Sequence, residues 1–345
     1  MNAPLTLPPV SRAVVMSGAR SVTDPDCFID RDMPLPDVGS RDLVVRVRAL
    51  SVNPVDVKVR RRAPPSQPPQ VLGWDAAGVV VATGSDCALF HEGDHVYYAG
   101  DINRPGSNSE YQVVDERLVG RMPANLDFAR AAALPLTALT AWEVLFERLD
   151  VRRPDTGGNG HLLVIAGAGG VGSMAIQMAR HAGLRVIATA SRPQSEAWVR
   201  AQGAHAVVDH SRGLVQEWRR LGLPLPEYIL CCAETDEYFD AMAELVAPQG
   251  RIGVLAGTKR PHDIQPLMQK SAALVWENIF AKSDWQTPDM ASQHRILDQV
   301  AHLVERGELR TTLTKVLGPL TAGNLREAHA RIESGRSIGK LVLTA

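Results

Sequence analysis

The alternation of apolar and polar residues changes character along the chain. In its first part, the run V-V-R-V-R-A-L-S-V from Val44 alternates with a period of two, and two further short strand-like runs begin at Gly78 and His95. Segments rich in proline, glycine and aspartate separate these runs. Because a period of two is typical of half-buried strands, this part predicts an antiparallel, barrel-like β domain.

The apolar pattern lengthens further along. The segment 131–146 predicts a helix, and the run D-T-G-G-N-G over 155–160 predicts a flexible connection. Strand and helix patterns then alternate over 162–257, which is typical of a parallel, doubly wound sheet. A helix from Ile296 and a short strand, K-L-V-L from Lys340, are expected near the end. The pattern therefore predicts an α/β protein with two domains.

Composition and charge restrict the partners. The 345 residues are 45% hydrophobic and 22% charged, which is ordinary for a globular enzyme. The formal net charge of -1 gives no general attraction toward nucleic acid or an anionic membrane. The most apolar long segment, 131–146, contains Pro135 and Glu143 and is too short to span a bilayer. We therefore expect neither nucleic acid nor a membrane as a partner.

The cysteines and the N-terminal residues predict a cytoplasmic location. Residues 1–10 lack the basic and apolar segments of a secretion signal. No C-x-x-C pair occurs, and vicinal cysteines do not readily form a relaxed disulfide or ligate one metal. Both features are expected in a reducing compartment. The cysteines are Cys27, Cys87, Cys231 and Cys232.

A glycine-rich segment follows the first strand of the predicted parallel sheet. The run L-L-V-I-A-G-A-G-G-V-G over 162–172 contains G-x-G-x-x-G, with an apolar strand before it and an amphipathic helix after it. In that context the glycines allow a tight turn and close approach of a pyrophosphate to the helix N-terminus. The alternative is a tight turn without a ligand. The residues of the predicted phosphate site are Gly167, Gly169, Gly170, Val171 and Gly172.

The end of the next strand distinguishes between the two nicotinamide cofactors. An NAD site usually places an acidic residue there, to accept hydrogen bonds from the ribose hydroxyls. Here Ser191 and Arg192 follow the strand instead, and the first acid is Glu196. A hydroxyl and a cation suit the 2′-phosphate of NADP(H), although a helix cap with an exposed arginine would have the same sequence. We therefore predict NADP(H), with His210 against the adenine ribose.

One apparent zinc motif has the wrong context. The string H-E-G-D-H over 91–95 fits H-E-x-x-H, but zinc binding needs it on a helix with both histidines on one face. Gly93 and Asp94 disfavour a helix, and a strand pattern begins beside them. The string therefore predicts a turn that leads into a strand.

Five segments of the chain match patterns of a known family. They are N-P-V-D-V (53–57), L-G-W-D-A-A-G-V-V (72–80), E-G-D-H-V (92–96), A-A-L-P-L-T-A-L-T-A-W (132–142) and A-G-A-G-G-V-G (166–172). They resemble the medium-chain dehydrogenase/reductase superfamily, in particular its quinone oxidoreductase branch and a group labelled zinc-type alcohol dehydrogenase-like. The resemblance implies a GroES-like β-barrel catalytic domain over 1–133, a Rossmann NADP(H)-binding domain over 134–275, and a return to the catalytic domain over 276–345. It also implies a homodimer.

Zinc ligands are missing at the positions that this resemblance assigns to them. Asn53 stands where the metal enzymes have a cysteine, and Trp74-Asp75 stands where they have His-Glu. No cysteine lies between Cys87 and Cys231, so the structural zinc loop is absent too. Because zinc needs three or four close ligands, we expect no metal site. Trp74 is expected to fill the space of the ligand histidine.

Without a Lewis acid, hydride transfer favours electron-poor acceptors. We therefore expect a zinc-independent, NADPH-dependent oxidoreductase acting on a quinone or an α,β-unsaturated carbonyl compound. An alcohol dehydrogenase acting on a small alcohol or aldehyde, and a non-catalytic NADPH-binding protein, are the alternatives. A metal assay distinguishes the first alternative, and binding without turnover identifies the second.

The resemblance also assigns residues to the reaction site. Asn53 and Asp56 match the N-x-x-D of the quinone oxidoreductases and should face the nicotinamide, although Asp56 could serve only as a helix cap. Lys58 replaces a tyrosine of that branch and is a candidate proton donor or an exposed lysine. Of Tyr97 and Tyr98, alternation allows only one to face the cleft. The residues expected to contact the cofactor are Thr140, Ala256, Gly257 and, at a phosphate, Lys340, whose alternative is a surface lysine.

Overall fold

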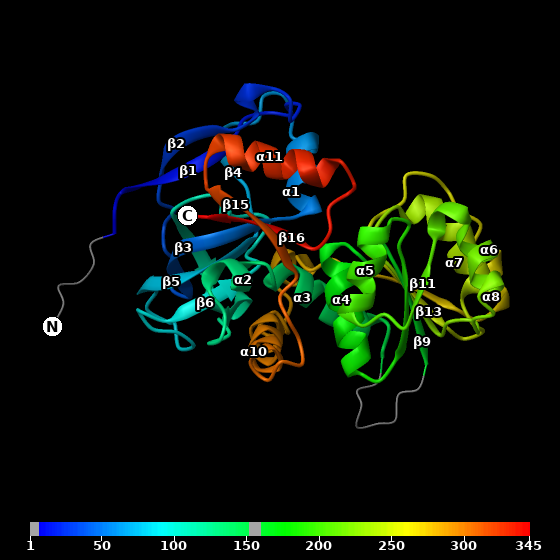
Figure 1. Ribbon diagram of the computed structural model, residues 1–345. Coiled ribbons are helices and arrows are strands. Elements are labelled where there is room, and N and C mark those ends of the chain that lie inside the picture. The colour runs from blue at the N-terminus through cyan, green and yellow to red at the C-terminus, as the bar shows by residue number, and fades with distance from the viewer. Residues whose placement is uncertain (1–6, 152–159) are drawn as a thin grey trace. The chain divides into compact units, whose positions relative to one another are not determined.

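The computed structural model describes residues 7–151 and 160–345. Residues 1–6 and most of the predicted flexible run over 155–160 lie outside this range. The chain divides into two compact units (Figure 1). Unit 1 comprises Met1–Leu136 and Phe280–Ala345, and unit 2 comprises Thr137–Ile279.

Unit 1 is built on mixed and antiparallel β structure. Its larger sheet has the strand order β15-β16-β3-β5-β6-β8, with β7 also paired to β3, and a smaller sheet has the order β2-β1-β4. The strands predicted from Val44, Gly78 and His95 are confirmed as β3, β5 and β6. The strands are β1 (Val10–Met16), β2 (Ile29–Pro34), β3 (Asp42–Val52), β4 (Gln70–Val71), β5 (Asp75–Thr83), β6 (His95–Tyr98), β7 (Tyr111–Asp115), β8 (Val119–Arg121), β15 (Leu313–Pro319) and β16 (Lys340–Thr344).

Two features of β6 bear on sequence predictions. The H-E-G-D-H string is a turn in which Gly93 has a φ of +92°, and β6 begins at its second histidine, so the motif is not helical. Tyr97 and Tyr98 are both fully buried, and that at most one of them can face a cleft stays a prediction. The Tyr97 hydroxyl donates to the Leu297 carbonyl at 2.6 Å, because α10 packs across the end of this sheet.

Unit 1 contains α1, α2, α9, α10 and α11. The predicted C-terminal helix is confirmed as α10, which starts four residues earlier than expected, at Ser292 instead of Ile296. The apolar residues of α10 recur every three or four positions and form a buried stripe. The bounds are α1 (Pro54–Arg62), α2 (Phe128–Ala132), α9 (Ala281–Asp284), α10 (Ser292–Glu305) and α11 (Ala322–Glu333).

The helix predicted over 131–146 is broken. The helix α2 ends at Ala132, and α3 (Pro135–Trp142) begins with the proline and continues as a wider π-helical turn over Glu143–Arg148. Proline has no N–H to continue the preceding hydrogen-bond ladder, but it is well suited to the first helical position. Pro135 therefore starts a new helix.

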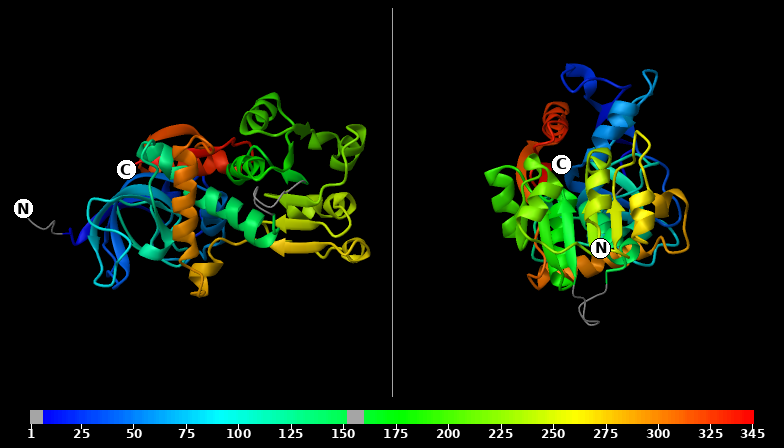
Figure 2. Two further views of the ribbon diagram at one scale, coloured as in Figure 1. Left: turned by 90° about the horizontal axis from the view of Figure 1, so that it is seen from below. Right: turned by 90° about the vertical axis from the view of Figure 1, so that its right-hand side faces the viewer.

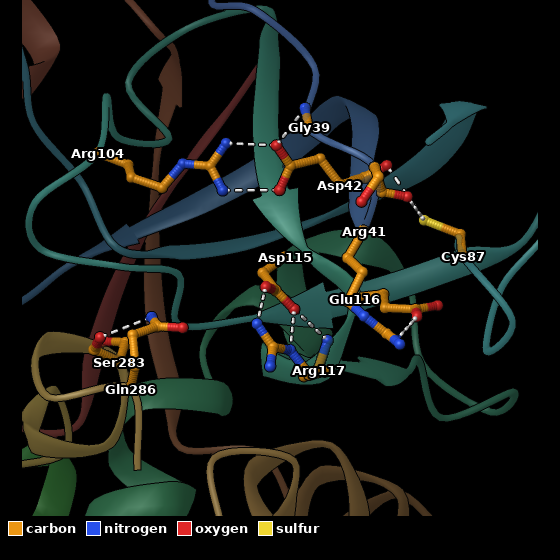
Figure 3. A network of polar contacts seen from close by, with 11 residues as sticks. Gly39, Arg41, Asp42, Cys87, Arg104, Asp115, Glu116, Arg117, Ser283 and Gln286 are labelled. Carbon is orange, nitrogen blue, oxygen red and sulfur yellow. Dashed lines mark hydrogen bonds and ion pairs between the residues drawn. The ribbon is translucent and has the colours of Figure 1, made fainter. Parts of the chain in front are cut away.

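A polar network fixes the loop that follows β6 (Figure 3). The Arg104 guanidinium donates to both carboxylate oxygens of Asp42, at 2.7 and 2.8 Å. Burial alone would raise the pKa of Asp42, but the Arg104 side chain and the Gly39 N–H hold it below the ordinary value. The same loop carries the Asp101 carbonyl, to which the Arg104 N–H donates.

Unit 2 is a parallel sheet with the strand order β11-β10-β9-β12-β13-β14. Neighbouring strands point the same way in the left view of Figure 2. This order is that of the doubly wound dinucleotide-binding fold, with the switch point between β9 and β12. The predicted α/β class is therefore confirmed. The strands are β9 (His161–Ile165), β10 (Arg185–Thr189), β11 (Ala206–Val208), β12 (Tyr228–Cys231), β13 (Arg251–Val254) and β14 (Ala273–Trp276).

Helices cover the parallel sheet. The helices α4 and α5 pack against each other and against β9–β11, whereas α6 to α8 form a separate group (Figure 1). Within residues 7–151 and 160–345, no helix combines the length and apolarity that crossing a bilayer requires. The bounds are α4 (Gly170–His181), α5 (Pro193–Gln202), α6 (Leu214–Arg220), α7 (Thr235–Leu245) and α8 (Gln265–Gln269).

Candidate active site

A buried polar cluster is centred on Asp75, the first residue of β5. The register places Ser51 of β3 opposite Asp75, and Val52 opposite Leu341 of β16. The strand pairing thereby brings residues 51, 53, 75 and 340 together. Asp75 is fully buried, and four donors satisfy its carboxylate. They are Ser51 Oγ (2.8 Å), Asn53 Nδ2 (2.8 Å) and Lys340 Nζ (2.9 Å) to Oδ2, and the Leu136 N–H (2.7 Å) to Oδ1.

Lys340 is a structural partner of this cluster, which corrects both sequence interpretations of the residue. It is only 3% exposed, so it is not a surface lysine. Its ammonium donates to Asp75, to Asn53 Oδ1 at 2.5 Å and to the Val52 carbonyl at 3.2 Å. Because an ammonium group has three N–H donors, none is left for a cofactor phosphate.

Asn53 and Asp56 lie together at the start of α1. Asn53 is the residue before the helix, and its N–H donates to Asp56 Oδ2 at 2.7 Å, so Asp56 does cap the helix. Burial raises the pKa of Asp56 to about 7, with a smaller contribution from the Asp75 charge, while the Asn53 N–H and Lys340 oppose the rise. Asp56 can therefore exchange a proton near neutral pH.

Trp74 is fully buried beside this cluster. Its indole Nε1 donates to the Asp101 carbonyl at 3.1 Å, and its ring meets Phe280 edge-on at 6.0 Å. Gly73 makes this position possible. It has a φ of +100°, and a Cβ there would lie 2.6 Å from the side chains of Ser107 and Asn108.

These residues do not fit a zinc ion. An indole is not a zinc ligand, and the Asp75 carboxylate already accepts four hydrogen bonds. The Lys340 ammonium, 2.9 Å from Asp75, would repel a divalent cation. In residues 7–151 and 160–345, no three His, Cys, Asp or Glu side chains form a group that could hold a metal.

The structure does not bring Lys58 into the cluster. It lies on the exposed face of α1, whereas Asp56 lies on the buried face. Lys58 therefore does not share the position of Asn53 and Asp56, and its assignment as a proton donor loses support. Thr140 is buried on α3, and its place beside a nicotinamide stays a prediction.

The glycine loop joins β9 to α4, as predicted. A Cβ on Gly172 would lie 2.6 Å from the Ala166 carbonyl oxygen and 2.7 Å from the Gly167 Cα, so only glycine allows this close approach. Ala166 itself has a φ of +61°, a strained value for alanine. At Gly169 a Cβ would meet only the Ala166 oxygen, at 3.4 Å, so space is open there. The loop fits a pyrophosphate at the N-terminus of α4.

The other residues predicted to bind the cofactor follow neighbouring strands of the same sheet. Ser191 and Arg192 follow β10, His210 follows β11, and Ala256 and Gly257 follow β13. Parallel strands end at one edge, so this edge carries all five together with the glycine loop. His210 Nδ1 has no hydrogen-bond partner in the described part of the chain, and nothing within 4 Å would meet a Cβ on Gly257.

Comparisons with known proteins agree with this architecture. Family models for the alcohol dehydrogenase GroES-like domain and for zinc-binding dehydrogenases match residues 39–124 and 170–292. A zinc-type alcohol dehydrogenase-like protein of Staphylococcus epidermidis is 38% identical over 96% of this chain and 99% of its own length. The chain belongs to the medium-chain dehydrogenase/reductase superfamily.

Two further members of the superfamily are similar to this chain. A crystal structure from Rhizobium etli, of a protein described as a zinc-dependent alcohol dehydrogenase, has a TM-score of 0.92 and 46% identity, over 97% of this chain and 98% of that one. An NADPH-dependent alkenal/one oxidoreductase of Arabidopsis thaliana is 29% identical over 91% of this chain and 75% of its own length. Members of the superfamily are nicotinamide-dependent oxidoreductases, and this chain is an oxidoreductase of that family.

Sequence patterns alone did not identify Lys340, Ser51 and Leu136 as hydrogen-bond partners of Asp75. The sequence does contain a signal for the pairing of Lys340 with Asp75. Asp75 and Lys340 are single charges that begin apolar strand segments. Buried charges are generally paired, so two isolated opposite charges of this kind are candidates for each other.

Proposed function

We propose that this protein is an NADPH-dependent reductase of quinones or α,β-unsaturated carbonyl compounds that works without a metal. The observation that carries the proposal is that hydrogen-bond donors already occupy the Asp75 carboxylate. The superfamily's metal enzymes hold zinc at this position, whereas here a lysine–aspartate pair and a buried tryptophan occupy it. Such a site cannot polarise an unactivated carbonyl or acidify an alcohol through a metal. Acceptors that are already electron-poor need no such help.

The relatives support the same substrate class. The Arabidopsis relative is named for NADPH and for alkenals and alkenones, which are α,β-unsaturated carbonyl compounds. We also expect the protein to be cytoplasmic and to form a homodimer. Other relatives are named for zinc, but the groups around Asp75 do not form a set of zinc ligands.

The residues at the carboxyl edge of the parallel sheet would hold the cofactor. Gly167, Gly169 and Gly172 shape the loop for the pyrophosphate, and Gly170 and Val171 open α4 with N–H groups that face it. When bound, the nicotinamide supplies the hydride. The backbone of Ala256 and Gly257 and the side chain of Thr140 are the groups we expect beside the ring.

Asn53 is the group we propose to bind the acceptor oxygen. Lys340 fixes Asn53 Oδ1 and Asp75 fixes one Nδ2 hydrogen, so the amide orientation is determined. Within the described residues, one Nδ2 hydrogen remains for a developing enolate or hydroquinone oxygen. With a pKa of about 7, Asp56 can hold or release a proton at neutral pH beside the backbone N–H of Asn53. The cluster therefore orients a donor and stores a proton without a metal.

Arg192 should determine the preference for NADPH. Arg192→Ala is expected to lower kcat/KM for NADPH about 10- to 100-fold, since a hydrogen bond to a charged group contributes about 1.5–3 kcal/mol. The value for NADH should change by less than about threefold. Arg185→Ala is the control, because Arg185 begins β10 at the end away from the proposed site. Equal losses with both cofactors would contradict the role of Arg192.

A panel of acceptors tests the proposed function. Oxidation of NADPH is measured with phenanthrenequinone, an alkenone and a saturated aldehyde, and reduction of NADP⁺ is measured with the matching alcohol. We expect turnover of the quinone or the alkenone and none with the saturated pair. Turnover of the alcohol and aldehyde alone would favour an alcohol dehydrogenase. Saturable NADPH binding without turnover of any acceptor would favour a non-catalytic binding protein.

A further inference from the structure

A groove on unit 1 runs along the exposed side of α1. Its volume is about 340 Å³, and it lies between α1, the segment that follows α1, and the loop after β6. Val55, Lys58, Val59 and Arg62 face it from successive turns of α1, and Ile102 and Gln67 close its other side. We call it the α1 groove.

The α1 groove has cationic but no anionic lining residues. Lys58 and Arg62 are four residues apart and therefore lie on the same face of the helix. No aspartate or glutamate of the described residues lines the groove, and amide groups such as that of Gln67 complete its polar part. A second cavity on unit 1 contains Arg12 but also Asp30 and Glu110, so its charges are mixed. The lining of the α1 groove therefore suits an anion, as does that of a third cavity on unit 1, which is lined by Lys315, Arg331 and Arg336.

The groove also has an apolar section. Val55 and Val59 alternate with the cations along the helix, and Ile102 lies opposite. An apolar chain can pack against these side chains while an anionic end group binds Lys58 and Arg62. Guanidinium and ammonium groups bind carboxylates and phosphates alike.

The position of the groove relates it to the proposed acceptor site. Asn53 immediately precedes α1, and a helix rises 1.5 Å per residue. Lys58 and Arg62 therefore lie roughly 8 and 14 Å further along the helix axis than Asn53. An extended chain of about seven to twelve bonds spans these distances.

We propose that the α1 groove binds the anionic end of an elongated substrate whose α,β-unsaturated carbonyl group reacts at Asn53. The inference rests on the proposed function. It narrows the substrate class to medium-chain enals or enones that carry a terminal carboxylate or phosphate. Lys58 and Arg62 bind the anionic group, and the apolar side chains between them and Asn53 contact the chain.

Matched substrates test this inference. The probes are a trans-2-enal of about ten carbons with a terminal carboxylate, its methyl ester, and the same enal with a terminal phosphate. For the unmodified enzyme, kcat/KM for the carboxylate or the phosphate should exceed that for the ester by about tenfold or more. The larger of the two values identifies the anionic group. Equal values for all three probes would overturn the inference.

Comparing Arg62→Glu with Arg61→Glu distinguishes binding in the groove from a general effect of surface charge on turnover. Both arginines are exposed neighbours on α1, but Arg61 does not line the groove. Arg62→Glu should lower kcat/KM for the preferred anionic substrate about 10- to 100-fold and leave the ester and phenanthrenequinone within about twofold. Arg61→Glu should leave all of them within about twofold. Equal losses in both variants, or an equal loss for the ester, would contradict a specific site.

Calorimetry tests binding in the groove without turnover. The two ligands are a saturated carboxylate of the same chain length as the enal and the methyl ester of that carboxylate. The carboxylate should bind more tightly than the ester, and Arg62→Glu should remove the difference. That result would support the groove even if the acceptor panel disproved the reductase. Equal binding of carboxylate and ester would overturn the groove even if quinones were reduced.

Discussion

The Lys340→Met variant should lose about 3–5 kcal/mol of unfolding free energy, because breaking a buried ion pair leaves its other charge unpaired. Methionine has a similar length but no charge, so Asp75 would stay fully buried with only neutral donors. Urea denaturation at pH 7 measures the loss. Because the ammonium does not reach a phosphate, the NADPH dissociation constant should change by less than about threefold, while kcat falls as Asn53 loses its fixed orientation.

A double-mutant cycle assigns this loss to the pair. Asp75→Asn combined with Lys340→Met should recover much of the stability, because no buried charge remains. Lys315→Met is the matched control: Lys315 is exposed on the adjacent strand β15, and its loss should cost less than about 0.5 kcal/mol. A loss below about 1 kcal/mol for Lys340→Met would show that the pair is not buried as described.

The Asp56→Asn variant should be more stable than the unmodified protein at pH 8, by roughly 4 kcal/mol, and equally stable near pH 4. The pKa of Asp56 is about 7 in the fold, against an ordinary value of 3.8. Its stabilising contribution is therefore complete below the lower value and is lost as the pH rises through the higher one. Each pKa unit corresponds to about 1.4 kcal/mol, and about three units separate the two values. Asparagine stays neutral throughout and keeps an acceptor for the Asn53 N–H.

Denaturation of both proteins from pH 4 to pH 8 measures this difference. Asp240→Asn, on the exposed face of α7, is the control for the loss of one negative charge. A stability difference that does not vary with pH would contradict a raised pKa of Asp56. Turnover adds a second observation: kcat of the unmodified enzyme should fall above pH 7 if the Asp56 proton is used.

The sequence was sufficient for the fold because its signals are local. The short apolar runs predict β3, β5 and β6, and the strand–glycine–helix order predicts β9 and α4 with the loop between them. The break in the helix predicted over 131–146 also has a local cause, because Pro135 cannot continue the preceding helix and starts α3.

The buried cluster depends instead on contacts between residues far apart in the sequence. Lys340 meets Asp75 only because β16 pairs with β3 and β3 pairs with β5 in particular registers. No local pattern specifies those registers, so the position of Lys340 suggested a phosphate or the surface. The burial of Tyr97 has the same origin, since its hydroxyl donates to Leu297 of α10, which lies in a distant part of the chain.

The most direct test of the metal-free reductase is the rate of NADPH oxidation with phenanthrenequinone, before and after dialysis against EDTA, with zinc quantified in the same samples. We predict an unchanged rate at a zinc content far below one ion per chain. A rate that is lost with EDTA and restored by zinc would contradict the account, because it would place a metal where the structure has Trp74 and the Lys340–Asp75 pair.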